Sequence, residues 1–134
     1  MNIVGKWKVK ELRLPTPDGV KVFTPDTLPD GEDFEEFARL AACLTEFASD
    51  GVVYTLMNVP EEYMEAARSE GVEFRDGMGI IETTSWKEQD GKFFYDTKVE
   101  GEALGNQVDP FAEIKVDENG CLLYNFETFL LERA

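Results

Sequence analysis

Apolar and polar residues alternate with a period of two near the start of the chain, which is the pattern of a strand with one buried face. In residues 3–14, Trp7 and Val9 share an apolar face, and Lys6 and Lys8 lie on the opposite one. The alternation therefore predicts a strand with one side in water. Further strand-like segments occupy residues 43–47, 52–57, 80–86, 92–98, 111–116, 121–126 and 128–133.

Dipeptides that favour tight turns separate several of these segments. Asp50-Gly51, Asp90-Gly91 and Asn119-Gly120 each stand between two predicted strands, and such pairs tolerate the positive φ angles of two-residue hairpins. Sequential hairpins predict an all-β fold, an antiparallel up-and-down closed β-barrel of about eight strands with two short helices. One domain spans residues 1–134, and a half-open barrel plugged by the helices is the alternative.

Two segments have helical spacing instead. In residues 30–44 the apolar positions include Phe34 and Phe37, and Asp33 with Glu36 predicts a capping box.

Residues 58–71 predict a second helix. Pro60 suits its first position and Gly71 suits its end. Residues 15–32 hold four of the six prolines, so we expect a long irregular loop there.

The composition narrows the classes of partner. The chain has 28 acidic and 13 basic residues, a net charge of −15, and no cluster of lysine or arginine. Such a surface repels nucleic acid and anionic membranes, so neither is expected as a partner. No apolar segment approaches the length needed to span a membrane, and the first residues do not form an apolar segment like that of a signal peptide. We therefore expect a cytoplasmic protein, a monomer or weak homodimer.

The chain lacks histidine, which excludes most imidazole-dependent catalysis and most transition-metal sites. Cys43 and Cys121 show no metal-binding spacing, and we expect them to be free, buried thiols. The acidic residues 26–33 fail the spacing of an EF-hand calcium loop, so a solvated loop is the favoured interpretation. We expect no cofactor and no metal.

The first strand carries a motif with a known counterpart. Gly5-Lys6-Trp7 resembles the G-x-W signature of lipocalins and their calycin relatives, here of a bacterial type. In that family the tryptophan closes one end of the barrel and packs against a basic side chain near the C-terminus, and Arg133 is the matching residue. The second lipocalin signature and the Arg-x-Tyr clamp of fatty-acid-binding proteins are not recognisable.

The resemblance implies non-catalytic binding of a small, largely apolar ligand inside the barrel. The inward positions that we expect to line a cavity are Val9, Phe34, Phe37, Val53, Tyr63, Ile80, Phe93, Tyr95, Phe111 and Phe129. For each of them, a purely structural place in the core is an equal alternative.

Two other functions remain open. A filled barrel would be an acidic protein-interaction module, and a facing carboxylate pair would indicate an enzyme. An apolar cavity of about 300 Å³ or more would favour the ligand carrier.

Overall fold

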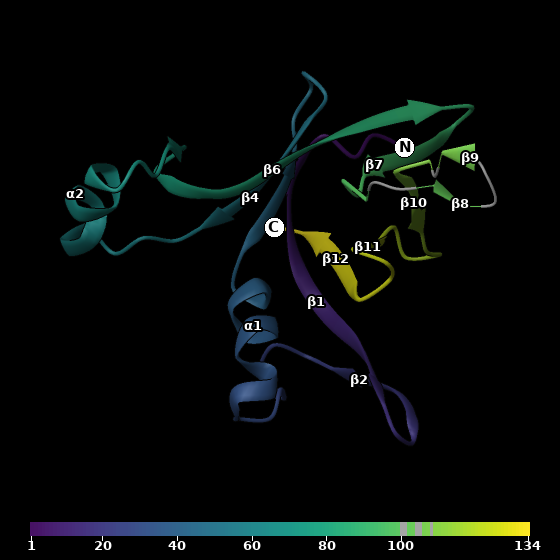
Figure 1. Cartoon of the computed structure of the whole chain (residues 1–134), viewed down its shortest axis with the longest axis horizontal. Coiled ribbons are helices and arrows are strands. Elements are labelled where there is room, and N and C mark those ends of the chain that lie inside the picture. Colours follow the sequence, from purple (N-terminus) through teal and green to yellow (C-terminus); the bar gives the residue numbers. More distant parts are fainter. Residues whose placement is uncertain (100–101, 104–105, 108) are drawn as a thin grey trace.

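The fold is a closed antiparallel β-barrel of eight strands. The computed structural model describes residues 1–99, 102–103, 106–107 and 109–134. Neighbouring barrel strands are antiparallel, and β12 pairs with β1 to close the ring (Figure 1). In order around the barrel, the strands are β1 (Gly5–Thr16), β3 (Leu44–Phe47), β4 (Val52–Met57), β6 (Met78–Gln89), β7 (Lys92–Asp96), β10 (Phe111–Val116), β11 (Leu122–Tyr124) and β12 (Phe129–Arg133).

The barrel closes because β1 has partners on both edges. Its first half pairs with β3, from Gly5 opposite Phe47 to Lys8 opposite Leu44. On its other edge it pairs with β12, and Trp7 lies opposite Arg133. Closure satisfies the backbone hydrogen-bonding groups that an open sheet would leave exposed. The predicted barrel and the meander order of its strands are confirmed.

The prediction of an irregular loop over residues 15–32 is wrong for the first part of that range. Residues 19–23 form β2 (Gly19–Phe23), which pairs with the second half of β1 in a hairpin beyond the barrel wall. The prolines of this segment do not prevent the pairing, because β2 contains no proline. Pro15 lies on the outer part of β1, opposite Val20. A separate short hairpin consists of β8 (Glu102–Ala103) and β9 (Asn106–Gln107).

Helix α1 (Glu32–Ala41) packs on the barrel core through Phe34, Phe37 and Leu40. The predicted capping box is wrong. Gly31 is the N-cap residue and no side chain caps the helix, while Glu36 pairs with Arg39 one turn later at 2.5 Å. An i,i+3 ion pair within the helix thus takes the carboxylate away from the N-terminal amides.

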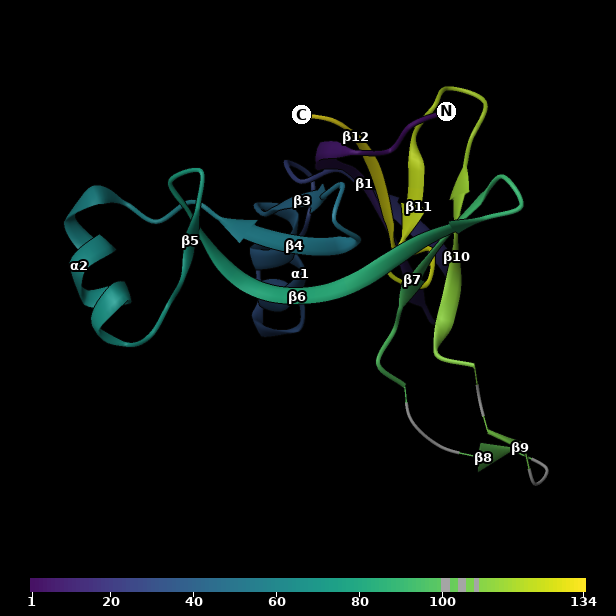
Figure 2. The same cartoon turned by 90° about the horizontal axis from the view of Figure 1, so that it is seen from above.

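Helix α2 (Glu61–Ser69) lies on an arm, residues 58–78, that extends away from the barrel between β4 and β6 (Figures 1 and 2). The arm also contains β5 (Phe74–Arg75), which pairs with the start of β6. Arg75 joins it to the barrel, since its guanidinium donates to both carboxylate oxygens of Glu46 at 2.9 and 3.0 Å. No side chain of α2 is buried.

Trp7 is 1% exposed and lies under Arg133, whose guanidinium carbon is 4.1 Å from the ring centroid. The indole nitrogen donates to the Ile3 carbonyl at 2.9 Å, and Arg133 donates to the carbonyls of Val4 and Asn2. Both side chains thereby tie the N-terminal segment to the last strand. The contact between Trp7 and Arg133 is confirmed.

Within the described part of the chain, neither helix is long and apolar enough to cross a bilayer.

Candidate functional site

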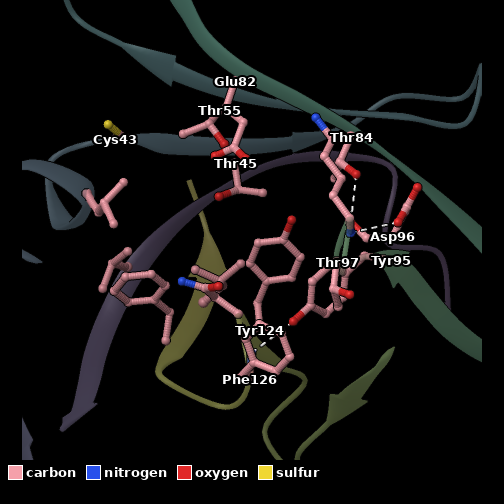
Figure 3. Close-up of a pocket in the computed structure, with 16 residues that line it drawn as sticks. Cys43, Thr45, Thr55, Glu82, Thr84, Tyr95, Asp96, Thr97, Tyr124 and Phe126 are labelled. Carbon is pink, nitrogen blue, oxygen red and sulfur yellow. Dashed lines mark hydrogen bonds between the residues drawn. The ribbon is translucent and has the colours of Figure 1, made fainter. Parts of the chain in front are cut away.

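The barrel interior is partly filled and partly hollow. A contiguous aromatic cluster occupies one region, formed by Phe47, Trp86, Phe93, Tyr95 and Tyr124 with ring centroids 4.5–6.3 Å apart. Beside it is a cavity of about 120 Å³ (Figure 3). Its lining residues are Val9, Leu40, Cys43, Thr45, Thr55, Glu82, Thr84, Tyr95, Asp96, Thr97, Lys98, Tyr124, Asn125, Phe126, Phe129 and Leu131.

A polar stripe crosses three adjacent strands on the inner wall of the cavity. Thr45 of β3 lies opposite Thr55 of β4, which in turn lies opposite Glu82 of β6. Strand pairing thus brings two hydroxyl groups and one carboxylate to the same part of the wall. Within the described residues, the side chains of these three have no hydrogen-bond partner in the protein. Their polar atoms are therefore free to bind a guest.

The polar stripe borders a gap between β6 and β7. The ladder between these strands ends at Trp86 opposite Tyr95, and from Ser85 to Gly79 β6 continues toward the arm paired with β4. Side chains bridge the gap, because the Thr84 hydroxyl donates to the Asp96 carbonyl at 2.7 Å and the Lys98 ammonium donates to the Thr83 carbonyl. Glu82 is exposed at this position, so it stands at the mouth of the cavity.

Two tyrosines form the boundary between the aromatic cluster and the cavity. Figure 3 shows the Tyr124 hydroxyl pointing across the cavity toward the side of Thr45, whereas Tyr95 points toward the turn at Phe126. Burial raises the pKa of Tyr124, and the nearby Tyr95 and Glu82 contribute to the increase. Burial also raises the pKa of Tyr95. Both hydroxyls are therefore neutral at physiological pH and able to donate hydrogen bonds.

The turn between β11 and β12 covers one side of the cavity in a strained conformation. Asn125, Phe126 and Glu127 have φ angles of 54, 56 and 65°, a left-handed run that side chains disfavour. The Tyr95 hydroxyl accepts a hydrogen bond of 2.9 Å from the Phe126 amide and holds this turn. Phe126 is 65% exposed although its ring borders the cavity.

Three of the predicted lining residues, Val9, Tyr95 and Phe129, border this cavity. Four others, Phe34, Phe37, Val53 and Phe93, belong to the packed core instead. They are inward or core-facing, as their spacing predicts, but the hollow lies elsewhere in the barrel.

The remaining three predicted lining residues lie outside the barrel interior. Tyr63 is 60% exposed on α2, and Ile80 lies where β6 enters the arm, with its amide bonded to the Glu73 carbonyl. Phe111 is on the outer wall under the ammonium of Lys87, which is 4.1 Å from its ring centroid. These three residues do not border this cavity, because amphipathic spacing shows which face is apolar but not which element faces the cavity.

The hydroxyl-bearing members of the site, Thr45, Thr55 and Tyr124, are not predicted from the sequence, whereas Glu82 and Asp96 are among the strand carboxylates that could form a facing pair. Thr45, Thr55 and Glu82 follow the inward parity of their strands, but polar residues at such positions are ordinarily read as solvent-facing. Tyr124 was within a predicted strand and carried no distinguishing signal. Only the strand register brings Thr45, Thr55 and Glu82 into one line. The sequence does not give that register, because it depends on the pairing of β3, β4 and β6.

The described residues offer little other chemistry. No group of three or more cysteine, aspartate or glutamate side chains is arranged to hold a metal ion there. Cys43 and Cys121 are free and buried, as predicted, and burial raises the pKa of both thiols. Among the residues that the structure describes, the carboxylates that border the cavity are those of Glu82 and Asp96, and Asp96 accepts a hydrogen bond from the Lys98 amide at 2.8 Å.

Comparisons with protein-family models, with curated proteins and with solved structures gave no match to this chain.

Proposed function

We propose that this protein binds one small ligand, without catalysis, in the cavity between Tyr124 and the polar stripe of Thr45, Thr55 and Glu82. The cavity of about 120 Å³ is smaller than the 300 Å³ expected for a drug-sized ligand. It is close to the roughly 150 Å³ of an engineered cavity that holds benzene. The ligand is therefore of about that size, far smaller than a fatty acid.

The observation that carries this proposal is the mixed lining of a hollow inside an otherwise packed barrel. Val9, Phe129 and Leu131 supply apolar wall, and Thr45 and Tyr124 supply hydroxyl groups. A packed interior fills apolar space and pairs its buried polar groups. A hollow that keeps unpaired hydroxyls beside an apolar wall instead suits a guest with an apolar body and a polar end.

We further propose a lipocalin-like or calycin-like relationship. Its support is the Gly5-x-Trp7 motif at the start of β1, with Arg133 stacked on the tryptophan, in a barrel of eight strands in meander order. The hairpin partner β2 and the arm are additions to that plan. The free thiols of Cys43 and Cys121 support a reducing compartment and hence a cytoplasmic protein.

Ligand binding is tested by mass spectrometry of small molecules released from the purified protein, together with titration of benzyl alcohol followed by NMR. We expect a released compound of benzene-like size and saturable shifts at Val9 and Leu131. Val9→Phe fills the cavity and is expected to abolish binding, whereas Val116→Phe, on the exposed face of β10, is expected to retain it. An empty extract together with no saturable binding by the wild-type protein would refute the proposal.

One observation favours the second candidate, an acidic protein-interaction module. Strand β2 presents Val20 and Val22, 69% and 56% exposed, on a hairpin beyond the barrel wall. An exposed apolar strand on an acidic protein suits a basic partner that adds a strand. Under this alternative Val20→Lys abolishes capture of a partner while benzyl alcohol does not bind.

A further inference from the structure

We propose that the polar end of the ligand is a protonated amine and that Glu82 is its charge partner. This inference rests on the proposed function and names the chemical class of the ligand at that same site. The ligand class is a small primary amine with an aromatic or compact aliphatic body.

The charges that border the cavity favour a cation. They are the carboxylates of Glu82 and Asp96 and the ammonium of Lys98. The Lys98 ammonium donates to the Thr83 carbonyl, and the Asp96 carboxylate accepts a hydrogen bond from the Lys98 amide. Glu82 has no such partner among the described residues and belongs to the polar stripe. Two carboxylates and one ammonium leave a net negative charge among the described residues that border the cavity.

The groups opposite Glu82 suit an ammonium as well. Figure 3 shows Glu82 and Tyr124 reaching the cavity from opposite sides, with Thr45 between them. The influence of Glu82 on the pKa of Tyr124 is consistent with this closeness. Hydroxyl oxygens accept hydrogen bonds from an ammonium, and the faces of aromatic rings attract it. A carboxylate ligand placed here would face Glu82 directly and be repelled.

Glu82 also has an exposure suited to reversible binding. It is exposed at the mouth, so the empty protein keeps the carboxylate solvated and needs no buried counter-ion. The apolar wall of Val9, Phe129 and Leu131 then receives the body of the ligand. The net charge of −15 raises the local concentration of small cations around the molecule.

The test compares three probes of matched shape, benzylamine, benzyl alcohol and benzoate, by isothermal titration with the full chain at neutral pH and low salt. We expect benzylamine to bind about tenfold more tightly than benzyl alcohol, because a charged hydrogen bond replaces a neutral one. Benzoate is expected to bind more weakly than both. Equal or tighter binding of benzyl alcohol or benzoate would overturn the amine assignment and leave the proposed function standing. Failure of all three probes to bind would overturn both.

Glu82→Gln isolates the charge. We expect this variant to lose about tenfold in affinity for benzylamine and to keep its affinity for benzyl alcohol within about twofold. Glu88→Gln is the matched control, since Glu88 is exposed on the same strand, does not border the cavity and changes the net charge equally. Retention of benzyl alcohol binding shows that Glu82→Gln is folded. An equal loss of benzylamine affinity in both variants would overturn the role of Glu82.

Discussion

At Gly5 the missing side chain leaves the space that Arg133 occupies. A Cβ atom at this position would lie 2.8 Å from the Arg133 guanidinium nitrogen, which is closer than real Cβ contacts. The φ angle of 129° is also in a region that other residues rarely adopt. Two physical requirements therefore favour glycine at this position of the G-x-W motif: the backbone conformation and the close approach of the Arg133 side chain.

Gly5→Ala tests both reasons. We expect a loss of about 1–3 kcal/mol in the free energy of unfolding, from backbone strain and from displacement of Arg133. Part of this loss should disappear in the Arg133→Ala background, where the clash is absent but the φ strain remains. Gly91→Ala is the matched control, because Gly91 has a φ angle of 78° and no atom within 4 Å of its added Cβ. Urea denaturation measures the wild type, both single variants, their double variant and Gly91→Ala, and additive losses would contradict the clash.

Trp7→Ala tests the anchoring role of the indole. Because Trp7 is 1% exposed and its nitrogen satisfies the Ile3 carbonyl, we expect a loss of about 3–5 kcal/mol in the free energy of unfolding. Tyr63→Ala removes a large aromatic side chain that is 60% exposed, so it should cost well under about 1 kcal/mol. A Trp7→Ala loss as small as that of Tyr63→Ala would mean that Trp7 is an edge residue. Urea denaturation of the two variants measures the difference.

At the scale of elements, the two helices have similar sequence signals and different surroundings. Both are amphipathic and both have acidic first turns. Only α1 supplies side chains to the barrel core, through Phe34, Phe37 and Leu40. Helix α2 depends on contacts within the arm, such as Arg68 over the ring of Phe74 at 4.9 Å. A nine-residue helix with so little packing is marginal by itself.

Hydrogen exchange should separate the two helices. We expect the amides of α2 to exchange with protection far below that of β1 and β12, because the arm opens without opening the barrel. Amides of α1 should be protected more than those of α2, since Leu40 and its neighbours must leave the core first. Exchange followed by mass spectrometry measures this order. Equal protection of α2 and the barrel strands would show that the arm and the barrel unfold together.

The sequence predicted the strands well because their turns and alternation are local signals. The ranges of β4 and β10 were predicted to the residue, whereas β2 was missed because its flanking prolines indicate a loop. The position of the hollow could not be predicted. It depends on the end of the β6–β7 ladder at Trp86 opposite Tyr95, and no local sequence pattern marks that point. The alternation of inward and outward positions predicts that Val53 and Phe93 line a cavity, although they belong to the packed core.

At the scale of the whole molecule, the charge imbalance opposes folding. With a net charge of −15 and mostly exposed ion pairs, such as Lys8 with Glu132, repulsion among carboxylates exceeds the local attractions. We therefore expect added sodium chloride to raise the melting temperature, because it screens this repulsion over about 10 Å at 0.1 M. Thermal denaturation at low and high salt measures the effect. A melting temperature that falls with salt would mean that attractive pairs dominate instead.

Stability at alkaline pH is expected to depend on the tyrosine that borders the cavity. The folded-state pKa of Tyr124 is raised above its unfolded value of about 10, mainly by burial. Its contribution to stability is thus fully present below that unfolded pKa. As the pH rises further, the unfolded chain loses the phenolic proton first and the contribution declines toward the folded pKa. The buried thiols of Cys43 and Cys121, whose pKa values are also raised, act in the same direction from about pH 8.5.

Tyr124→Phe separates the tyrosine from the thiols. We expect the fall in unfolding free energy between about pH 9.5 and about pH 11 to be smaller in this variant by about 1 kcal/mol. The ultraviolet titration should lose its most alkaline phenolate transition as well. Tyr63→Phe, on the exposed face of α2, is the control and should leave the pH dependence of stability as it is in the wild type. If Tyr124→Phe and Tyr63→Phe gave the same alkaline slope, the hydroxyl of Tyr124 would have to be solvated and not buried beside the cavity.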